Sequence, residues 1–222
     1  MWRVWVYKMS LNPKLNKFST ASPIIASYDY TDLASGLGIQ VFEGFATTIA
    51  TPTIAYELAE NPILSAPPNT GKVINNGSAS EVYTFKTTAF NLAQTITGIG
   101  YTAFTHSCAA SSQTGESTVT ITLQHYDGGT TTITDIGEAV TTQKQAAANQ
   151  SDYWNEYLPI TITEKVFKVG DKLYIKVTHD MIASAVGNRT FNFYHDPLEA
   201  LVGNTTVITS FKTQLPFKID NI

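Results

Sequence analysis

The sequence predicts an all-β protein: an antiparallel β-sandwich of the jelly-roll kind, with about 8–10 strands and little helix. Three observations lead to this fold class. Apolar and polar residues alternate with a period of two in several segments, Thr, Val, Ile, Tyr and Phe dominate those segments, and Gly beside Asn or Asp stands between them. Because sandwiches often reach this length as one unit, we expect an N-terminal arm and tether over residues 1–24 and one sandwich domain over residues 25–222.

The first expected element is a strand at residues 2–7, which carries large apolar or aromatic side chains on both faces. Such a strand is costly to leave in water, and its free edge favours pairing. Residues 10–23 contain Asn12-Pro13 and Ser22-Pro23 without alternation, as a tether would. We therefore expect strand addition to a second copy, in a trimer or, next, a dimer; the alternative is pairing within the same sandwich. The expected interface residues are Trp2, Val4, Trp5, Val6 and Tyr7.

Weaker strand patterns follow, and the clearest ones lie in the second half of the chain. The weaker segments are 39–47, 53–58, 82–90, 92–104, 130–136, 205–211 and 215–220. In the clear strands every apolar residue is followed by Thr, Tyr, Lys, Gln or Asn, so one face should be buried. The residues expected to point into a single core are Val119, Ile121, Leu123, Ile160, Ile162, Leu173, Ile175, Val177, Phe191 and Phe193.

Two glycine turns predict hairpins. The strands joined would be 116–126 with 130–136 across Asp127-Gly128-Gly129, and 160–168 with 172–179 across Gly170-Asp171. Helix is expected only as a short segment within 138–150 and as one turn after Asp196-Pro197.

Composition excludes several classes of function. Charged residues make up 14% of the chain, and Thr, Asn, Ser and Gln take their place, as is common in extracellular and particle-forming β-proteins. A net charge of −4 argues against nucleic-acid binding, and no apolar run is long enough to cross a membrane. The single cysteine, Cys108, excludes an internal disulfide and a thiolate metal cluster, and we expect it to be a small buried hydrophobe.

Three histidines, His125, His179 and His195, each end a predicted strand close to an aspartate. If those strand ends met, the imidazoles and carboxylates would suit a transition metal. We favour the alternative, in which His and Asp close strands and satisfy turn backbones. The turn Asp127-Gly128-Gly129 and Asn188 offer oxygen ligands for calcium, but no acidic alternation accompanies them. We therefore predict no metal and no cofactor.

An aromatic group at Tyr153, Trp154 and Tyr157, beside Asn155 and Glu156, would make a platform for stacking sugar rings. The alternative is a packed loop or subunit contact, because Tyr and Trp are also enriched in interfaces. No nucleophile elbow, metalloprotease helix or phosphate loop is present, so we predict no catalytic residues and no enzyme. A glycosidase with two carboxylates far apart in the chain stays open.

The C-terminal third carries a family resemblance. Its marks are Val169-Gly170-Asp171-Lys172-Leu173, Phe193-Tyr194-His195-Asp196-Pro197 and Gln214-Leu215-Pro216-Phe217-Lys218, with Tyr28-Asp29-Tyr30-Thr31-Asp32 near the N-terminus. This order resembles uncharacterised β-sandwich virion proteins of tailed phages and environmental viruses. The resemblance implies a capsid decoration, tail or fibre-associated subunit that self-assembles, meets other virion proteins and resides in a particle assembled in the host cytoplasm. The alternative function is a carbohydrate-binding module or adhesin for surface glycans; a hydrolase comes third.

Overall fold

The computed structural model describes residues 37–50, 53–60, 69–109, 114–148, 152–197 and 210–218. These residues form eleven β-strands and no helix, so the all-β prediction is confirmed, and no membrane-spanning helix occurs among them. The strands are β1 (Leu37–Ala50), β2 (Thr53–Ala59), β3 (Asn69–Lys86), β4 (Gln94–Ala109), β5 (Thr114–Tyr126), β6 (Ile133–Asp135), β7 (Val140–Thr141), β8 (Gln145–Ala148), β9 (Asp152–Phe167), β10 (Lys172–Tyr194) and β11 (Phe211–Lys218).

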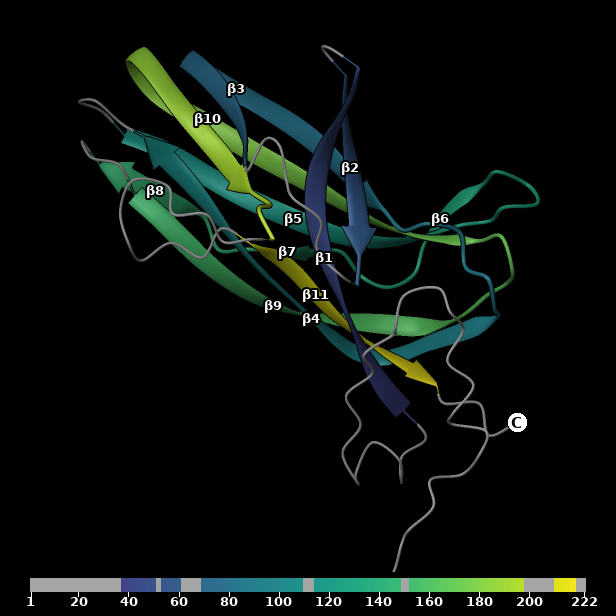
Figure 1. Ribbon diagram of the computed structural model, residues 1–222. Coiled ribbons are helices and arrows are strands. Elements are labelled where there is room, and N and C mark those ends of the chain that lie inside the picture. The colour runs from purple at the N-terminus through teal and green to yellow at the C-terminus, as the bar shows by residue number, and fades with distance from the viewer. Residues whose placement is uncertain are drawn as a thin grey trace, which may run out of the picture.

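One continuous sheet folds over into the two layers of a sandwich (Figure 1). The first layer has the order β6-β5-β10-β3, with β7 and β8 also paired to β5. The second layer has the order β2-β1-β11-β4-β9. Two pairings join the layers: the last part of β10 pairs with β4, and Glu57 of β2 pairs with Lys86 of β3 in the one parallel contact described.

The long strands β3 and β10 lie side by side and change direction together (Figure 1). Gly77 has a φ of +128°, a conformation that glycine adopts readily, and the β10 register shifts between Ala183 and Asn188. Lys72 and Glu81, from opposite sides of this bend, form an ion pair. The bend lets β10 pair first with β5 and then with β4.

The core lies between the layers, and all ten residues predicted for it are at most 4% exposed; nine of them share one buried cluster, whereas Phe191 belongs to a second cluster with Cys108 and Met181. Phenylalanines from both layers meet there, with ring centroids 4.8 Å apart for Phe85–Phe211 and 5.5 Å for Phe104–Phe193. The predicted register is therefore correct. Thr161 and Thr120 lie on outer faces, as expected, although Thr122 and Tyr174 on the outer side of the first layer are each only 7% exposed.

Of the two predicted hairpins, one is confirmed and one is wrong. Strands β5 and β6 pair across the Asp127 turn, whose carboxylate accepts hydrogen bonds from the backbone of Gly129 and Thr130. Strands β9 and β10 do not pair, because β9 joins β4 in the second layer and β10 joins β5 and β3 in the first. The turn at Gly170-Asp171 therefore crosses between layers.

The short helix expected within 138–150 is also wrong. This stretch forms β7 and β8 along the edge of β5, with Ala147 fully buried and Ala146 exposed, as in a strand. Several other predictions, including the arm at residues 2–7 and most of the strand at 205–211, lie outside the described residues.

Candidate functional site

The expected aromatic platform lies on β9, an edge strand of the second layer, but strand alternation divides it. Tyr153 and Tyr157 point to the outer face and are 40% and 60% exposed. Trp154 points the other way, into the space between the layers, where it packs against a core cluster. The structure thus keeps two of the three predicted residues together and removes Trp154 from the platform.

A residue that the sequence analysis missed, Tyr101 of β4, completes the platform. Tyr101 pairs with Pro159 and Tyr157 pairs with Ala103, so the two tyrosines are diagonal neighbours on one face. Their rings stack with centroids 5.1 Å apart and an interplanar angle of 13°. The alternation in 92–104 placed Tyr101 in a strand, but its neighbour depends on long-range register.

Amide groups accompany the tyrosines. Asn155 lies between Tyr153 and Tyr157 on the same face, and its side-chain oxygen accepts a hydrogen bond of 2.6 Å from Thr105. Gln214 of β11 is exposed and pairs with Tyr101. We call Tyr101, Tyr153, Asn155, Tyr157 and Gln214 the tyrosine strip. The nearest charged pair in the ladder is Lys212 with Glu43, whose ammonium and carboxylate are 3.6 Å apart.

Behind the tyrosine strip, a chain of polar side chains crosses the interior. Ser117 Oγ contacts His106 Nδ1 at 2.8 Å and His179 Nε2 at 2.7 Å. His106 Nε2 lies 3.5 Å from Glu156 Oε1, which also accepts a hydrogen bond from Gln145. One proton assignment satisfies every contact: His179 donates to Ser117, Ser117 to His106, and His106 points its N–H at Glu156.

Burial sets the protonation of this chain. It lowers the pKa of His179 to about 3, with the nearby His106 adding to the effect, so His179 is neutral near pH 7. Contact with His106 lowers the pKa of Glu156, which is therefore ionised. The neutral imidazole of His179 and the carboxylate of Glu156 thus lie at opposite ends of this series of polar contacts.

Ser117, His106 and Glu156 have the order of a serine–histidine–acid triad, with the two ring nitrogens exchanged. The nucleophile of such a triad must reach a substrate. Ser117 is 1% exposed and His106 is fully buried, with the indole of Trp154 against the imidazole in a tilted arrangement, ring centroids 5.1 Å apart. We assign this chain of contacts to the packing of the interior, where each buried polar atom needs a partner.

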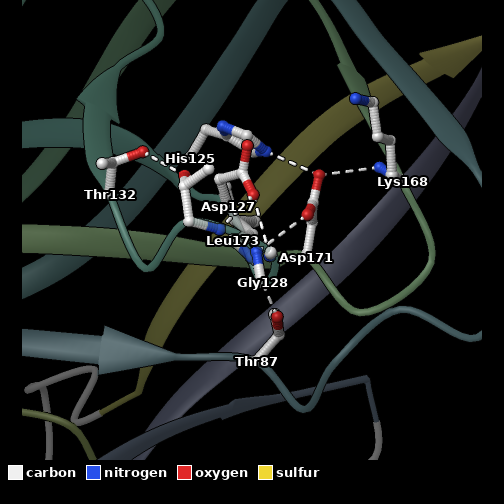
Figure 2. A network of polar contacts seen from close by, with 10 residues as sticks. Thr87, His125, Asp127, Gly128, Thr132, Lys168, Asp171 and Leu173 are labelled. Atoms are coloured by element: carbon white, nitrogen blue, oxygen red, sulfur yellow. Dashed lines mark hydrogen bonds and ion pairs between the residues drawn. The ribbon is translucent and has the colours of Figure 1, made fainter.

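A second polar network closes one end of the sandwich (Figure 2). The Asp171 carboxylate accepts hydrogen bonds from His125 Nε2 at 2.7 Å and from the backbone nitrogens of Gly128 at 3.0 Å and Lys168 at 2.8 Å. Burial raises the pKa of Asp171, but these hydrogen bonds outweigh it and lower the pKa to about 2. Asp171 therefore fastens the turn after β5 to the turn before β10.

The three histidines considered as metal ligands lie in three separate networks. His125 binds Asp171, His179 binds Ser117, and His195 Nε2 contacts Thr70 Oγ1 at 2.9 Å. Across the described ranges no group of three or more His, Cys, Asp or Glu side chains is placed to hold a metal ion. The three histidines therefore do not meet at one rim, as the metal-binding alternative required. Cys108 is fully buried, as predicted, and burial raises its pKa to about 11.

Comparisons with known proteins give distant likenesses of fold only. No protein-family model matches the chain, and a search of curated proteins finds no similar sequence. Among solved structures, an alpha-amino acid ester hydrolase matches with 10% identity and a TM-score of 0.47, over 79% of this chain and 36% of the other. An aminopeptidase from a marine sediment archaeon, Thaumarchaeota archaeon, matches with 6% identity and a TM-score of 0.48, over 81% and 37%.

A family 61 carbohydrate-binding module in complex with β-1,4-galactotriose matches with 15% identity and a TM-score of 0.27, over 76% of this chain and 84% of that one. The chain therefore spans little more than a third of the two hydrolytic enzymes.

The prediction that this chain is not an enzyme is contradicted by these hydrolase matches and is not retained. That prediction depended on missing local motifs, which say nothing of residues that folding brings together from distant positions.

Proposed function

We propose that this chain is a carbohydrate-binding β-sandwich that takes a neutral glycan along the tyrosine strip. The observation that carries the proposal is Tyr157, which is 60% exposed yet held against Tyr101 in a parallel stack. A stacked neighbour fixes the ring, so it presents a rigid apolar face to solvent. Sugar rings offer a matching apolar face of C–H groups.

The spacing along β9 suits an extended ligand. Tyr153 and Tyr157 are four residues apart in a strand, which places them about 13 Å apart. Asn155 lies midway between the two tyrosines. Its amide can therefore bind the hydroxyls of a glycan whose sugar rings stack on Tyr153 and Tyr157. The strip itself contains no ionisable group other than tyrosine, so a neutral oligosaccharide of several units fits it best.

The same kind of surface occurs at protein interfaces, where Tyr is also enriched. The virion location stays a prediction. The trimer formed through residues 2–7 also stays a prediction, because these residues lie outside the described part of the chain. Glycan binding is compatible with either a particle subunit or a module of a larger protein.

A glycan array tests the proposal. We expect the full chain to bind neutral oligosaccharides and Tyr157→Ala to weaken that binding about tenfold, since aromatic contact is worth about 1 kcal/mol or more. Val82→Ala, which changes an exposed apolar residue of the first layer, is the matched control and should bind normally. Equal binding by Tyr157→Ala and the control, or no binding to any glycan, would overturn the proposal.

A further inference from the structure

Three lysines surround one tyrosine on the outer face of the first layer. Lys86 of β3 lies directly opposite Tyr174 of β10, while Lys172 and Lys176 stand two residues before and after it on the same face. Each lysine is therefore about 7 Å or less from Tyr174 in strand spacing. We call Lys86, Lys172 and Lys176 the lysine triangle.

Two stacked rings contact two of the three lysines. Tyr174 and Tyr126 stack with centroids 5.3 Å apart and an interplanar angle of 15°. Lys86 Nζ lies 5.4 Å from the centroid of Tyr174, and Lys172 Nζ lies 5.8 Å from that of Tyr126. The lysine stems cover the rings and leave Tyr174 only 7% exposed. The ammonium groups of Lys86 and Lys172 are thus held over these rings on the outer face of the sheet.

Four of the other described lysines are neutralised by a carboxylate, whereas the triangle, like Lys165 and Lys168, has no such partner among the described residues. Lys72, Lys144, Lys212 and Lys218 each contact a carboxylate. Within the described ranges no ion pair is found for the lysine triangle. Glu57 of β2 is the register partner of Lys86, and Asp135, beyond Gln124 in the ladder, accepts a hydrogen bond from the Gln124 side chain. A chain with a net charge of −4 therefore gathers three cations on one patch.

We propose that the lysine triangle binds an acidic polysaccharide, at a site distinct from the tyrosine strip of the other layer. Lysine ammonium groups act as hydrated point charges, which suits sulfate or carboxylate groups spaced along a chain. Thr84 pairs with Lys176 on the neighbouring strand β3 and offers a partly exposed hydroxyl to the sugar between charges. The negative net charge disfavours nucleic acid, which presents a denser row of phosphates.

Dextran sulfate and unsubstituted dextran, immobilised for surface plasmon resonance, test the site. The full chain should bind dextran sulfate in low salt and lose binding as salt is raised. The triple variant Lys86→Gln, Lys172→Gln, Lys176→Gln should bind about tenfold more weakly. The triple variant Lys72→Gln, Lys144→Gln, Lys218→Gln changes the net charge equally and should bind like the wild type.

If both triple variants lost dextran sulfate binding equally, net charge alone would explain the loss, and the proposed site would be wrong. Stronger binding to a short DNA duplex than to dextran sulfate would overturn the choice of ligand. Tyr157→Ala should leave dextran sulfate binding unchanged, so failure of this site and failure of the tyrosine strip can be told apart.

Discussion

Single side chains decide which face of β9 can bind a ligand. Tyr153 and Tyr157 point outward because they stand an even number of residues apart, and Trp154 points inward because it is offset by one. This division follows from strand alternation and could be predicted from the sequence once residues 152–167 were assigned to a strand. The stack with Tyr101 could not, because the register between β4 and β9 is a long-range property.

Trp154→Ala should therefore reduce stability and spare glycan binding. The indole packs against His106 and a core cluster, so its removal leaves a cavity and should lower the free energy of unfolding by about 2–4 kcal/mol. Urea unfolding gives the stability, and calorimetry on the folded variant gives the affinity. A variant of normal stability that no longer binds glycan would return Trp154 to the platform.

Gly115 is a position where a methyl group does not fit. A Cβ there would lie 2.5 Å from Cys108 Sγ and 3.1 Å from the ring of Phe191. Gly115→Ala should lower the free energy of unfolding by about 1–3 kcal/mol. Adding Cys108→Ala removes the closest atom and should restore part of the loss in a double-mutant cycle. Purely additive effects would show that the two residues do not collide.

At the scale of strands and turns, alternation predicts strands well and their partners less well. The core strands and the β5–β6 hairpin follow from local sequence. The turn at Gly170-Asp171 looks the same in sequence as a hairpin turn, yet it crosses between layers. The crossing is stabilised by contacts of Asp171 with His125 and Gly128, which are remote in sequence and cannot be predicted from a local pattern.

Asp171→Asn tests that role. The amide cannot accept all three hydrogen bonds with a full negative charge, so we expect the free energy of unfolding to fall by about 2–4 kcal/mol. Asp127→Asn, at a carboxylate of the adjoining turn, should lower stability less than Asp171→Asn does. Chemical denaturation of both variants compares them directly. Similar small losses would mean that Asp171 does not hold the turns together.

Acid should destabilise the whole molecule through its buried histidines. Burial lowers the pKa of His179 to about 3 and that of His195 to about 4, both from an ordinary value of 6.5. Between the folded pKa values and 6.5, the unfolded chain binds more protons than the folded one. The two neutral histidines therefore contribute their full stabilisation above pH 6.5, and this contribution falls as the pH drops toward 4. Asp171 adds a further loss below pH 3.8.

Urea unfolding at a series of pH values measures this dependence. His179→Gln removes one titrating group, so its curve should be flatter than that of the wild type between pH 6.5 and 4. If wild-type stability stays constant over this range, the two imidazoles are not held neutral by burial.

The most direct test of the central claim, that an extended neutral glycan lies along β9, is calorimetric titration with oligosaccharides of increasing length. The series is built on whichever neutral sugar the array selects. Affinity should rise with length until the ligand spans the distance of about 13 Å between Tyr153 and Tyr157, and then level off. Tyr153→Ala should abolish the rise while keeping the affinity for the shortest ligand. An affinity that ignores both ligand length and Tyr153 would contradict the account.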